Sequence, residues 1–427
     1  MDYSSSMDKY LKRLVDDRLD KYLKTFGAVS IVGPKWTGKT RTCEEHSKSA
    51  FYFTARPGEP NPLELARLDS SYVFKGENPR LIDEWQLMPE VWDMVRGDVD
   101  AHRGEKGLYL LAGSSIPPQK KKGNVIKHSG AGRIAKLNMS TMSLFETGDS
   151  SGDVSLASLF ENAPIEGRIR HVSLAEIIHY IVRGGWPGNL DVEEVGLLPL
   201  DYVERIFDFE IKQLDVPNVD ILKFRRFMYS LARNESTVCS ISTLAKDASV
   251  NGRALDDETI TGYLSILDAL FLLDNQEAFS PEFRSRTRLK IGSKHHFADP
   301  SIAVALVGAN ESNLLKDLRY LGFLFESLVE HDLRLYAEVL GGKVFHYQDY
   351  SNDEIDAVVS LADGRFGLIE IKLGYEGVVE DAAANLIRVS DKLERKPEFL
   401  AVVSGMAIAP VKRPDGVYVI PLTALRP

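Results

Sequence analysis

A glycine-rich stretch near the amino end has the residue types and spacing of a phosphate-binding loop. Its glycines let backbone N–H groups close around phosphates, its lysine can reach the β- and γ-phosphates, and its last hydroxyl can hold Mg²⁺. The predicted binding residues are Gly33, Pro34, Lys35, Trp36, Thr37, Gly38, Lys39 and Thr40. The apolar run 28–32 predicts a buried strand before the loop, and the residues from 41 onward can open a helix. The sequence therefore predicts a site for ATP with Mg²⁺.

Further polar residues downstream could complete a hydrolytic site. Asp83 and Glu84 follow a short apolar run, and we expect Asp83 to coordinate Mg²⁺ through water and Glu84 to polarise the attacking water. Ser114, at the end of the apolar run 107–113, is the candidate γ-phosphate sensor; a serine-rich turn is the alternative. Arg133, at a loop-to-strand junction, could stabilise the transferred phosphoryl group in its own site or in a neighbouring chain, or could be an ordinary surface arginine.

Hydrophobic periodicity supplies the elements around these residues. We expect an amphipathic helix over 8–26, strands over 50–55 and 107–115, and helices over 173–183 and 199–214. Helices over 222–232, 241–248 and 257–270, followed by a strand that begins at 271–274, have the layout of a winged helix.

Basic residues follow this module, and the arginines at every second position place their side chains on one face of a strand. The candidate DNA-contacting residues are Arg284, Arg286, Arg288, Lys290 and Lys294. Without base-reading groups, such contacts to phosphates would be independent of DNA sequence. A solvated charged hairpin is the alternative, and the acidic start of the preceding helix at 256–258 would repel phosphates.

The last third of the chain places acidic residues and a lysine on predicted neighbouring strands. Asp356 lies on a strand over 352–359, and Glu370 and Lys372 lie on a strand over 366–372 that returns after the turn Asp363-Gly364. Glu326, on a helix over 321–335, could be a further ligand. Carboxylates on neighbouring strands can share Mg²⁺, and the lysine can position water or offset charge. Alternating Glu and Lys is also frequent surface decoration of a strand.

Composition limits the class of protein. Hydrophobic residues make up 44% and charged residues 27%, which is typical of a globular chain, and 427 residues predict two or three domains. The net charge of −10 argues against indiscriminate adhesion to nucleic acid but not against a local basic patch. No apolar run approaches a membrane span, the first residues are polar and acidic, and the only two cysteines are far apart. A reduced cytoplasmic protein fits best.

Taken together, these motifs resemble a bacterial and archaeal family of AAA-plus-like ATPases. The stretches that carry the resemblance are 33–40, 83–86, 130–133, 184–187, 297–300, 322–326 and the acidic pair near 355. The chain departs from the family at Lys35-Trp36, where Arg-Gln is frequent, and at Ala112-Gly113-Ser114, where Thr-Gly-Ser is frequent. The Asp356 and Glu370-x-Lys372 pattern also resembles the active site of restriction-like nucleases and archaeal junction resolvases.

The resemblance implies an α/β chain with three domains. These are a P-loop ATPase domain with a helical lid over 1–215, a winged-helix domain over 216–300, and a restriction-endonuclease-like domain over 301–427. It also implies a homo-oligomer, with a hexamer as one form. The expected function is ATP hydrolysis coupled to remodelling or processing of DNA, either duplex or branched DNA such as a four-way Holliday junction. The alternative is a signalling or defence switch whose last domain binds a protein and cuts nothing.

Overall fold

The structure is a computed structural model that describes residues 10–55, 58, 60–114, 126–213, 219–249, 254–280, 291–351 and 353–427. The chain divides into two compact units. One is formed by the chain up to Ser140 with short pieces near 212 and at 269–271, and the other by most of the chain from Thr141 onward. The first unit therefore ends well before the expected boundary at residue 215, because the residues from Thr141 to Ile211 pack with the second unit.

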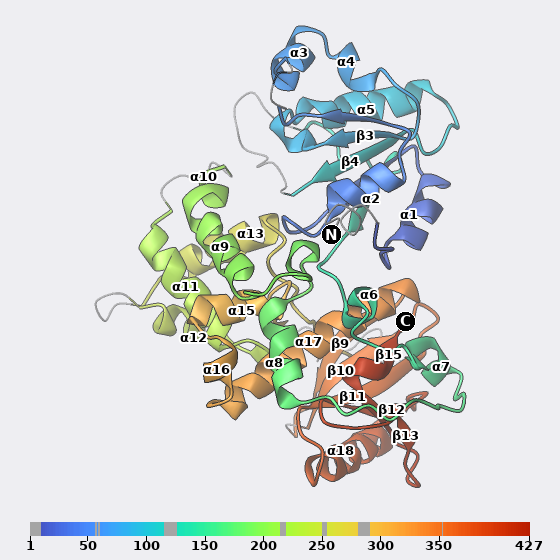
Figure 1. The fold of residues 1–427 in the computed structure, drawn as a ribbon, viewed down its shortest axis with the longest axis vertical. Helices are drawn as coiled ribbons and strands as arrows, with labels where there is room; N and C mark the ends of the chain where they lie inside the picture. Colours follow the sequence, from blue (N-terminus) through green and yellow to red (C-terminus); the bar gives the residue numbers. More distant parts are fainter. Residues whose placement is uncertain are drawn as a thin grey trace, which may run out of the picture. The chain divides into compact units, whose positions relative to one another are not determined.

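The first unit contains a parallel sheet whose strands follow the order β2-β3-β4-β1-β5. Strands β3 and β4 of this sheet are labelled in Figure 1. The strands are β1 (Ala28–Val32), β2 (Ser49–Tyr52), β3 (Arg80–Asp83), β4 (Tyr109–Gly113) and β5 (Ile134–Asn138). β1 coincides with the predicted strand. Every residue of β1, β3 and β4 is buried, as expected for a parallel sheet with both faces covered.

Helices cover both faces of this sheet. α1 (Asp16–Leu23) and α2 (Lys39–Glu45) pack on the face that presents Val29, Leu81 and Leu110. α3 (Pro62–Leu68), α4 (Ser71–Phe74) and α5 (Glu90–Ala101) pack on the face that presents Ala28, Ile82 and Leu111. Because the side chains of successive residues in a strand point to opposite faces of the sheet, each strand contributes to both hydrophobic cores. The helix predicted over 8–26 is shorter in the structure.

The second unit begins with the helices α6 (Leu144–Thr147), α7 (Leu156–Phe160), α8 (Leu174–Arg183) and α9 (Leu197–Arg205) and the short strand β6 (Val154–Ser155), which precedes α7. α9 continues through a π-helical turn (Ile206–Glu210) into α10 (Ile211–Gln213). The helices predicted in the middle of the chain are present as α11 (Ile221–Arg233), α12 (Ile241–Asp247) and α13 (Asp257–Ala269). β7 (Thr237–Val238) pairs antiparallel with β8 (Lys294–His295), and isolated bridges join Leu273 to Phe297 and Gln276 to Lys294. A continuous strand does not begin at Phe271, whose φ is 56°.

Two motifs of the predicted family meet inside the second unit. Trp186 is fully buried, and its Nε1 donates to Ser301 Oγ at 2.9 Å. The backbone N–H of Gly185 donates to Asp299 Oδ2 at 2.9 Å, and Asp299 also caps α15 (Pro300–Val307). α16 (Glu311–Leu314) follows. These residues hold α8 against α15.

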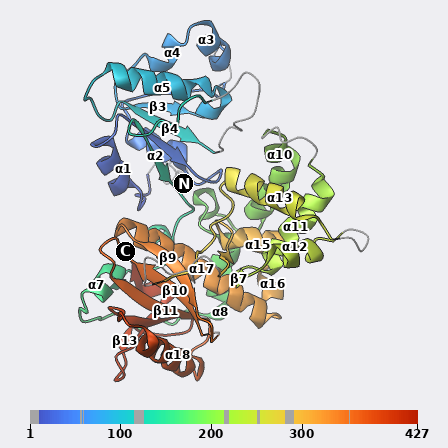
Figure 2. The same cartoon turned by 180° about the vertical axis from the view of Figure 1, so that it is seen from behind.

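The carboxyl-terminal third contains a mixed sheet with the order β13-β14-β12-β11-β10-β9. Strands β9, β10 and β11 of this sheet are labelled in Figure 2. The elements of this part of the chain are α17 (Leu318–Val339), β9 (Lys343–Gln348), β10 (Glu354–Ser360), β11 (Phe366–Lys372), α18 (Val378–Lys392), β12 (Leu400–Ser404), β13 (Val411–Lys412), β14 (Tyr418–Pro421) and β15 (Leu425–Arg426). β15 pairs with β6 and does not belong to the mixed sheet. β9, β10 and β11 are antiparallel neighbours, whereas β11, β12 and β14 are parallel. α17 contacts β9, β10 and β11, and α18 contacts β11 and β12. Among the helices described, none combines the length and hydrophobicity needed to span a bilayer.

Candidate functional site

The phosphate loop joins the carboxyl end of β1 to the amino end of α2. Gly38, the residue before α2, has φ 93° and ψ 15°, a left-handed conformation that glycine adopts without steric cost. Gly33 passes so close to Met139 that a Cβ would lie 2.0 Å from the Met139 carbonyl oxygen. Thr37 is fully buried, and its Oγ1 donates to the carbonyl oxygen of Pro34 at 3.1 Å. Backbone packing therefore holds the loop in one shape; within it, Lys35 is half-buried and Trp36 is exposed.

The end of the loop faces the end of β3. Thr40 Oγ1 donates to Asp83 Oδ1 at 2.9 Å, so the hydroxyl and the carboxylate predicted to serve Mg²⁺ lie side by side. Lys39 is buried, and its Nζ donates to the carbonyl oxygen of Gly33 at 3.0 Å and to that of Pro34. The carboxyl ends of parallel strands meet at one edge of a sheet, which is why residues so far apart in sequence converge here.

Burial perturbs the two charged groups at the base of this site. Burial lowers the pKa of Lys39 to about 8, although the nearby Glu84 carboxylate opposes the shift. Burial also raises the pKa of Asp83 to about 6; the Thr40 hydrogen bond opposes this shift, and Glu84 adds to it. An anionic phosphate beside the lysine and a cation beside the aspartate would each favour the charged form. The donor set thus fits ATP with Mg²⁺, held by Lys39, Thr40 and Asp83.

Glu84 is positioned by a glutamine two residues further along the chain. Glu84 has φ 55° and ψ 39°, a left-handed conformation that is uncommon for a residue other than glycine. It precedes the short helical turn Trp85–Leu87, and that turn brings Gln86 Nε2 to Glu84 Oε2, to which it donates. The same amide nitrogen lies 3.4 Å from Ser114 Oγ, at the end of β4. Gln86 therefore connects the predicted water-polarising carboxylate to the predicted phosphate sensor.

Arg13 contacts the phosphate loop from the amino-terminal segment, and the sequence analysis did not identify it. The side chain is 5% exposed; Nη1 donates to the Thr37 carbonyl oxygen at 2.7 Å and Nη2 to the Ser140 carbonyl oxygen at 2.9 Å. It thereby ties the loop to the last residue of the first unit. Nothing in the local sequence distinguishes Arg13 from the other charged residues of its segment.

The predicted metal-binding carboxylates of the last domain lie in a carboxylate–lysine cluster within the second unit. Its members are Lys294 on β8, Glu326 on α17, Asp356 on β10, and Glu370 and Lys372 on β11. Lys372 Nζ lies 2.8 Å from Asp356 Oδ2 and 2.6 Å from Glu370 Oε2. Asp356 Oδ2 also accepts from the Ile371 backbone N–H at 2.8 Å, and Glu370 Oε1 accepts from Asn385 Nδ2 at 2.7 Å.

Lys294 does not lie where the sequence placed it. We expected it on an exposed strand that contacts DNA, but it is 6% exposed and its Nζ donates to Glu326 Oε1 at 2.7 Å. Buried carboxylates attract the ammonium inward, and its charge is no longer available to a phosphate backbone. The other candidate DNA contacts, Arg284, Arg286, Arg288 and Lys290, lie outside the described residues.

The cluster does not fit the Mg²⁺ site of a nuclease. Within the described residues, no group of three or more histidine, cysteine, aspartate or glutamate side chains converges so as to hold a metal ion. Each carboxylate of the cluster instead accepts from, or lies beside, an ammonium group. The structure therefore brings together Glu326, Asp356, Glu370 and Lys372. Their carboxylates are paired with ammonium groups of lysines.

Three family models match successive parts of the chain. Residues 25–148 match an AAA domain. With the loop geometry and the parallel sheet described above, this match identifies the first unit. It is a P-loop ATPase domain of the AAA type. Residues 174–313 match a domain of unknown function (DUF8612), and residues 321–425 match another (DUF4143).

Among solved structures, the chain is similar to a Walker-type ATPase of Pyrococcus abyssi, with 12% identity and a TM-score of 0.40 over 70% of this chain and 96% of that one. It is also similar to the Aeropyrum pernix ORC1 protein in complex with DNA, with 12% identity and a TM-score of 0.26 over 72% and 95%. The overlap is too low in either case to support an inference about this chain. No curated protein sequence matches it.

Within the AAA domain, Arg133 lies at the edge of the sheet opposite the phosphate loop. It precedes β5, and its carbonyl oxygen accepts from the N–H of Ala28, the first residue of β1. Its Nε donates to Asp100 Oδ1 at 2.8 Å. The phosphate loop follows the last residue of β1, whereas Arg133 lies beside the first residue of β1. Arg133 therefore cannot reach a nucleotide bound in its own chain. That part of the prediction is corrected, and only a role in a neighbouring chain stays open.

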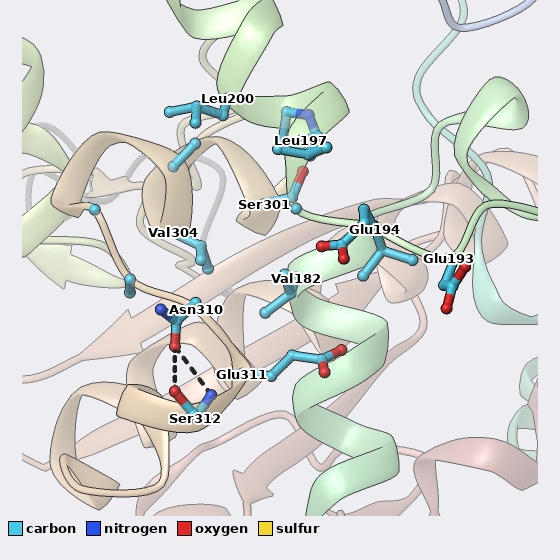
Figure 3. Close-up of a pocket in the computed structure, with 16 residues that line it drawn as sticks. Val182, Glu193, Glu194, Leu197, Leu200, Ser301, Val304, Asn310, Glu311 and Ser312 are labelled. Atoms are coloured by element: carbon cyan, nitrogen blue, oxygen red, sulfur yellow. Dashed lines mark hydrogen bonds between the residues drawn. The ribbon is translucent and has the colours of Figure 1, made fainter.

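The second unit also contains a cavity of about 510 Å³ (Figure 3). Its walls come from α8, the start of α9, α15 and the start of α16, and its lining includes apolar Val182, Val304 and Leu200 beside acidic Glu194 and Glu311. Among the described residues, the lining includes none of the predicted site residues and no basic side chain.

Proposed function

We propose that the protein hydrolyses ATP in its AAA domain and that turnover changes the state of the domains that follow. The observation that carries this proposal is the 2.9 Å contact between Thr40 Oγ1 and Asp83 Oδ1, with Lys39 and Glu84 beside it. When bound, ATP with Mg²⁺ supplies the electrophilic phosphorus and the charge that balances the phosphates. Lys39 holds the phosphates, and Glu84, oriented by Gln86, accepts a proton from the attacking water.

Two substitutions test the assignment of these roles. In Lys39→Ala, ATP retention and turnover should both be lost, because the phosphates lose their main cationic contact. In Glu84→Gln, turnover should fall by about 10²–10⁴-fold, the contribution typical of a general base, while ATP retention survives. A Glu84→Gln protein that turns over ATP at the wild-type rate would remove Glu84 from the mechanism. A Lys39→Ala protein that retains ATP normally would remove the nucleotide site itself.

We further propose that DNA is the partner on which turnover acts. The support is the basic run Arg284, Arg286, Arg288 and Lys290, which follows three helices in winged-helix order. Contact through four phosphates would give a log–log salt slope of about −3.6, since each phosphate neutralised contributes about −0.9. Gel shifts with duplex, single-stranded and four-way DNA at several salt concentrations test this. Binding of no DNA form at low salt would end the proposal.

The assembly of the protein is part of the same proposal. An arginine supplied by a neighbouring chain can stabilise phosphoryl transfer, and Arg133 lies at the edge of the sheet away from its own loop. A homo-oligomer, including a hexamer, would give that arginine a target. Light scattering with and without ATP measures the assembly directly, and a protein that stays monomeric with ATP leaves Arg133 without a catalytic role.

The second candidate function is an ATP-dependent switch whose last domain binds a protein. The observation that favours it is the inward pairing of Lys294, which removes a cation from the expected DNA-contacting face. The start of α13 carries the exposed acidic residues Asp257 and Glu258, which also disfavour contact with DNA phosphates. ATP turnover measured with and without four-way DNA discriminates the two: stimulation by DNA supports the first candidate, and indifference to every DNA form supports the second.

A further inference from the structure

The inference concerns the lysine at the centre of the carboxylate–lysine cluster. Lys294 belongs to the part of the chain that matches the DUF8612 model, whereas Glu326, Asp356, Glu370 and Lys372 belong to the part that matches DUF4143. Its Nζ lies 2.7 Å from Glu326 Oε1 and 3.8 Å from Asp356 Oδ1. A cation from one domain is thus inserted between two carboxylates of the next.

The insertion offsets part of the negative charge of the cluster. Glu326, Asp356 and Glu370 bring three carboxyl groups into a largely buried region, and Lys294 and Lys372 bring two ammonium groups. Burial alone would lower the pKa of Lys294, but Glu326 and Asp356 outweigh it and raise the pKa above its usual value. Burial alone would raise the pKa of Asp356, but Lys372 and Lys294 hold it below its usual range. Lys294 and Asp356 therefore each favour the charged form of the other. Burial has the opposite effect on the other two carboxyl groups and raises the pKa of Glu326 to about 7 and that of Glu370 to about 8.

The ammonium group occupies the space that a divalent cation would need. Mg²⁺ binds carboxylate oxygens at about 2.0–2.1 Å and demands near-octahedral geometry. The Glu326 oxygen that would face such an ion already accepts from Lys294, and Asp356 Oδ2 already accepts from Lys372 and the Ile371 backbone. A cation and the Lys294 ammonium cannot both occupy the position between Glu326 and Asp356.

We propose that Lys294 takes the place of the divalent cation in this cluster. The carboxylates are arranged around a built-in ammonium group, and a metal ion enters only when that side chain is removed. Metal-assisted cleavage of a phosphodiester is accordingly not an activity of the chain while Lys294 is in place. This inference does not depend on ATP hydrolysis or on the identity of the partner.

Titration of the full chain with Mn²⁺, without nucleotide and followed by electron paramagnetic resonance, tests the proposal. The wild type should show no Mn²⁺ site that depends on Asp356. Lys294→Ala should bind Mn²⁺ at least about tenfold more tightly than the wild type, because the freed carboxylate oxygens are ligands that this ion prefers. Adding Asp356→Asn to Lys294→Ala should abolish the gain. Lys343→Ala, which removes an exposed lysine of β9, is the matched control and should behave as the wild type.

Lys294→Met keeps the aliphatic volume and serves if the alanine variant fails to fold. Folded Lys294→Ala or Lys294→Met protein that binds Mn²⁺ no better than the wild type would overturn the proposal. Thermal melts of the wild type decide the matter without a variant at position 294. Tm should be the same in EDTA and in Mn²⁺, whereas a Tm gain with Mn²⁺ that Asp356→Asn abolishes would show that the native cluster binds a metal and that Lys294 does not replace it.

Discussion

Removal of the Gln86 amide should slow ATP hydrolysis without weakening ATP binding. Gln86 Nε2 donates to Glu84 Oε2. A hydrogen bond to a charged group contributes about 1.5–3 kcal/mol. If that energy is realised in orienting Glu84 toward water in the transition state, its loss lowers kcat by about 10- to 100-fold, at 1.36 kcal/mol per tenfold. The substitution is Gln86→Ala.

The assay separates the chemical step from binding. Turnover as a function of ATP concentration gives kcat and KM, and a fluorescent ATP analogue gives the dissociation constant. Gln348→Ala is the matched control, because Gln348 on β9 makes the same kind of bond, to Glu354 Oε1 at 2.7 Å, outside the AAA domain. Gln86→Ala should lower kcat and leave the dissociation constant unchanged. An unchanged kcat, or a loss confined to affinity, would refute the positioning role.

Three further predictions concern the buried residues Glu235 and Trp186 and the exposed Arg133. Burial raises the pKa of Glu235 to about 8 although Ser327 donates to it, so its contribution to stability is complete below about pH 4.5 and is lost as the pH rises through 8. Glu235→Gln should therefore flatten the fall in stability, by a few kcal/mol at about 1.4 kcal/mol per pKa unit, in denaturant titrations at pH 5 and pH 9. Trp186→Ala should cost about 3–5 kcal/mol in the same titration and Trp186→Phe less, because the alanine leaves a cavity beside Ser301. Arg133→Ala should leave turnover unchanged at protein concentrations too low for association, and a loss there would mean that the arginine acts within its own chain.

The nucleotide site was the most predictable part of the molecule. Its strand is a continuous apolar run, its loop has glycines where a left-handed turn and a close backbone approach need them, and Asp83 ends a neighbouring parallel strand. Sequence spacing therefore implied that Thr40 and Asp83 meet. The position of Arg133 could also have been predicted. Arg133 precedes β5, the phosphate loop follows β1, and the two strands are parallel, so Arg133 and the loop lie at opposite edges of the sheet.

Long-range charge pairing was not predictable from local pattern. The basic residues before position 295 suggested an exposed strand face, but β8 is only two residues long and its lysine turns toward carboxylates on α17 and β10. Alternation along a strand indicates which residues share a face, and it does not indicate whether solvent or another domain covers that face. Local pattern also does not show that the 141–211 segment packs with the second unit, where Trp186 Nε1 donates to Ser301 Oγ.

α17 has a mechanical consequence for the second unit. At 1.5 Å per residue, Glu326 and His331 lie about 7.5 Å apart along its axis. His331 Nε2 is bonded to Thr141 Oγ1 at 3.0 Å, and Asp332 Oδ2 accepts from the Leu144 N–H at 3.1 Å, whereas Glu326 holds Lys294. One helix thus joins the first residues of the second unit to the lysine of the cluster. Because Thr141 and Lys294 are both bonded to side chains of α17, we expect a displacement of one to shift the other.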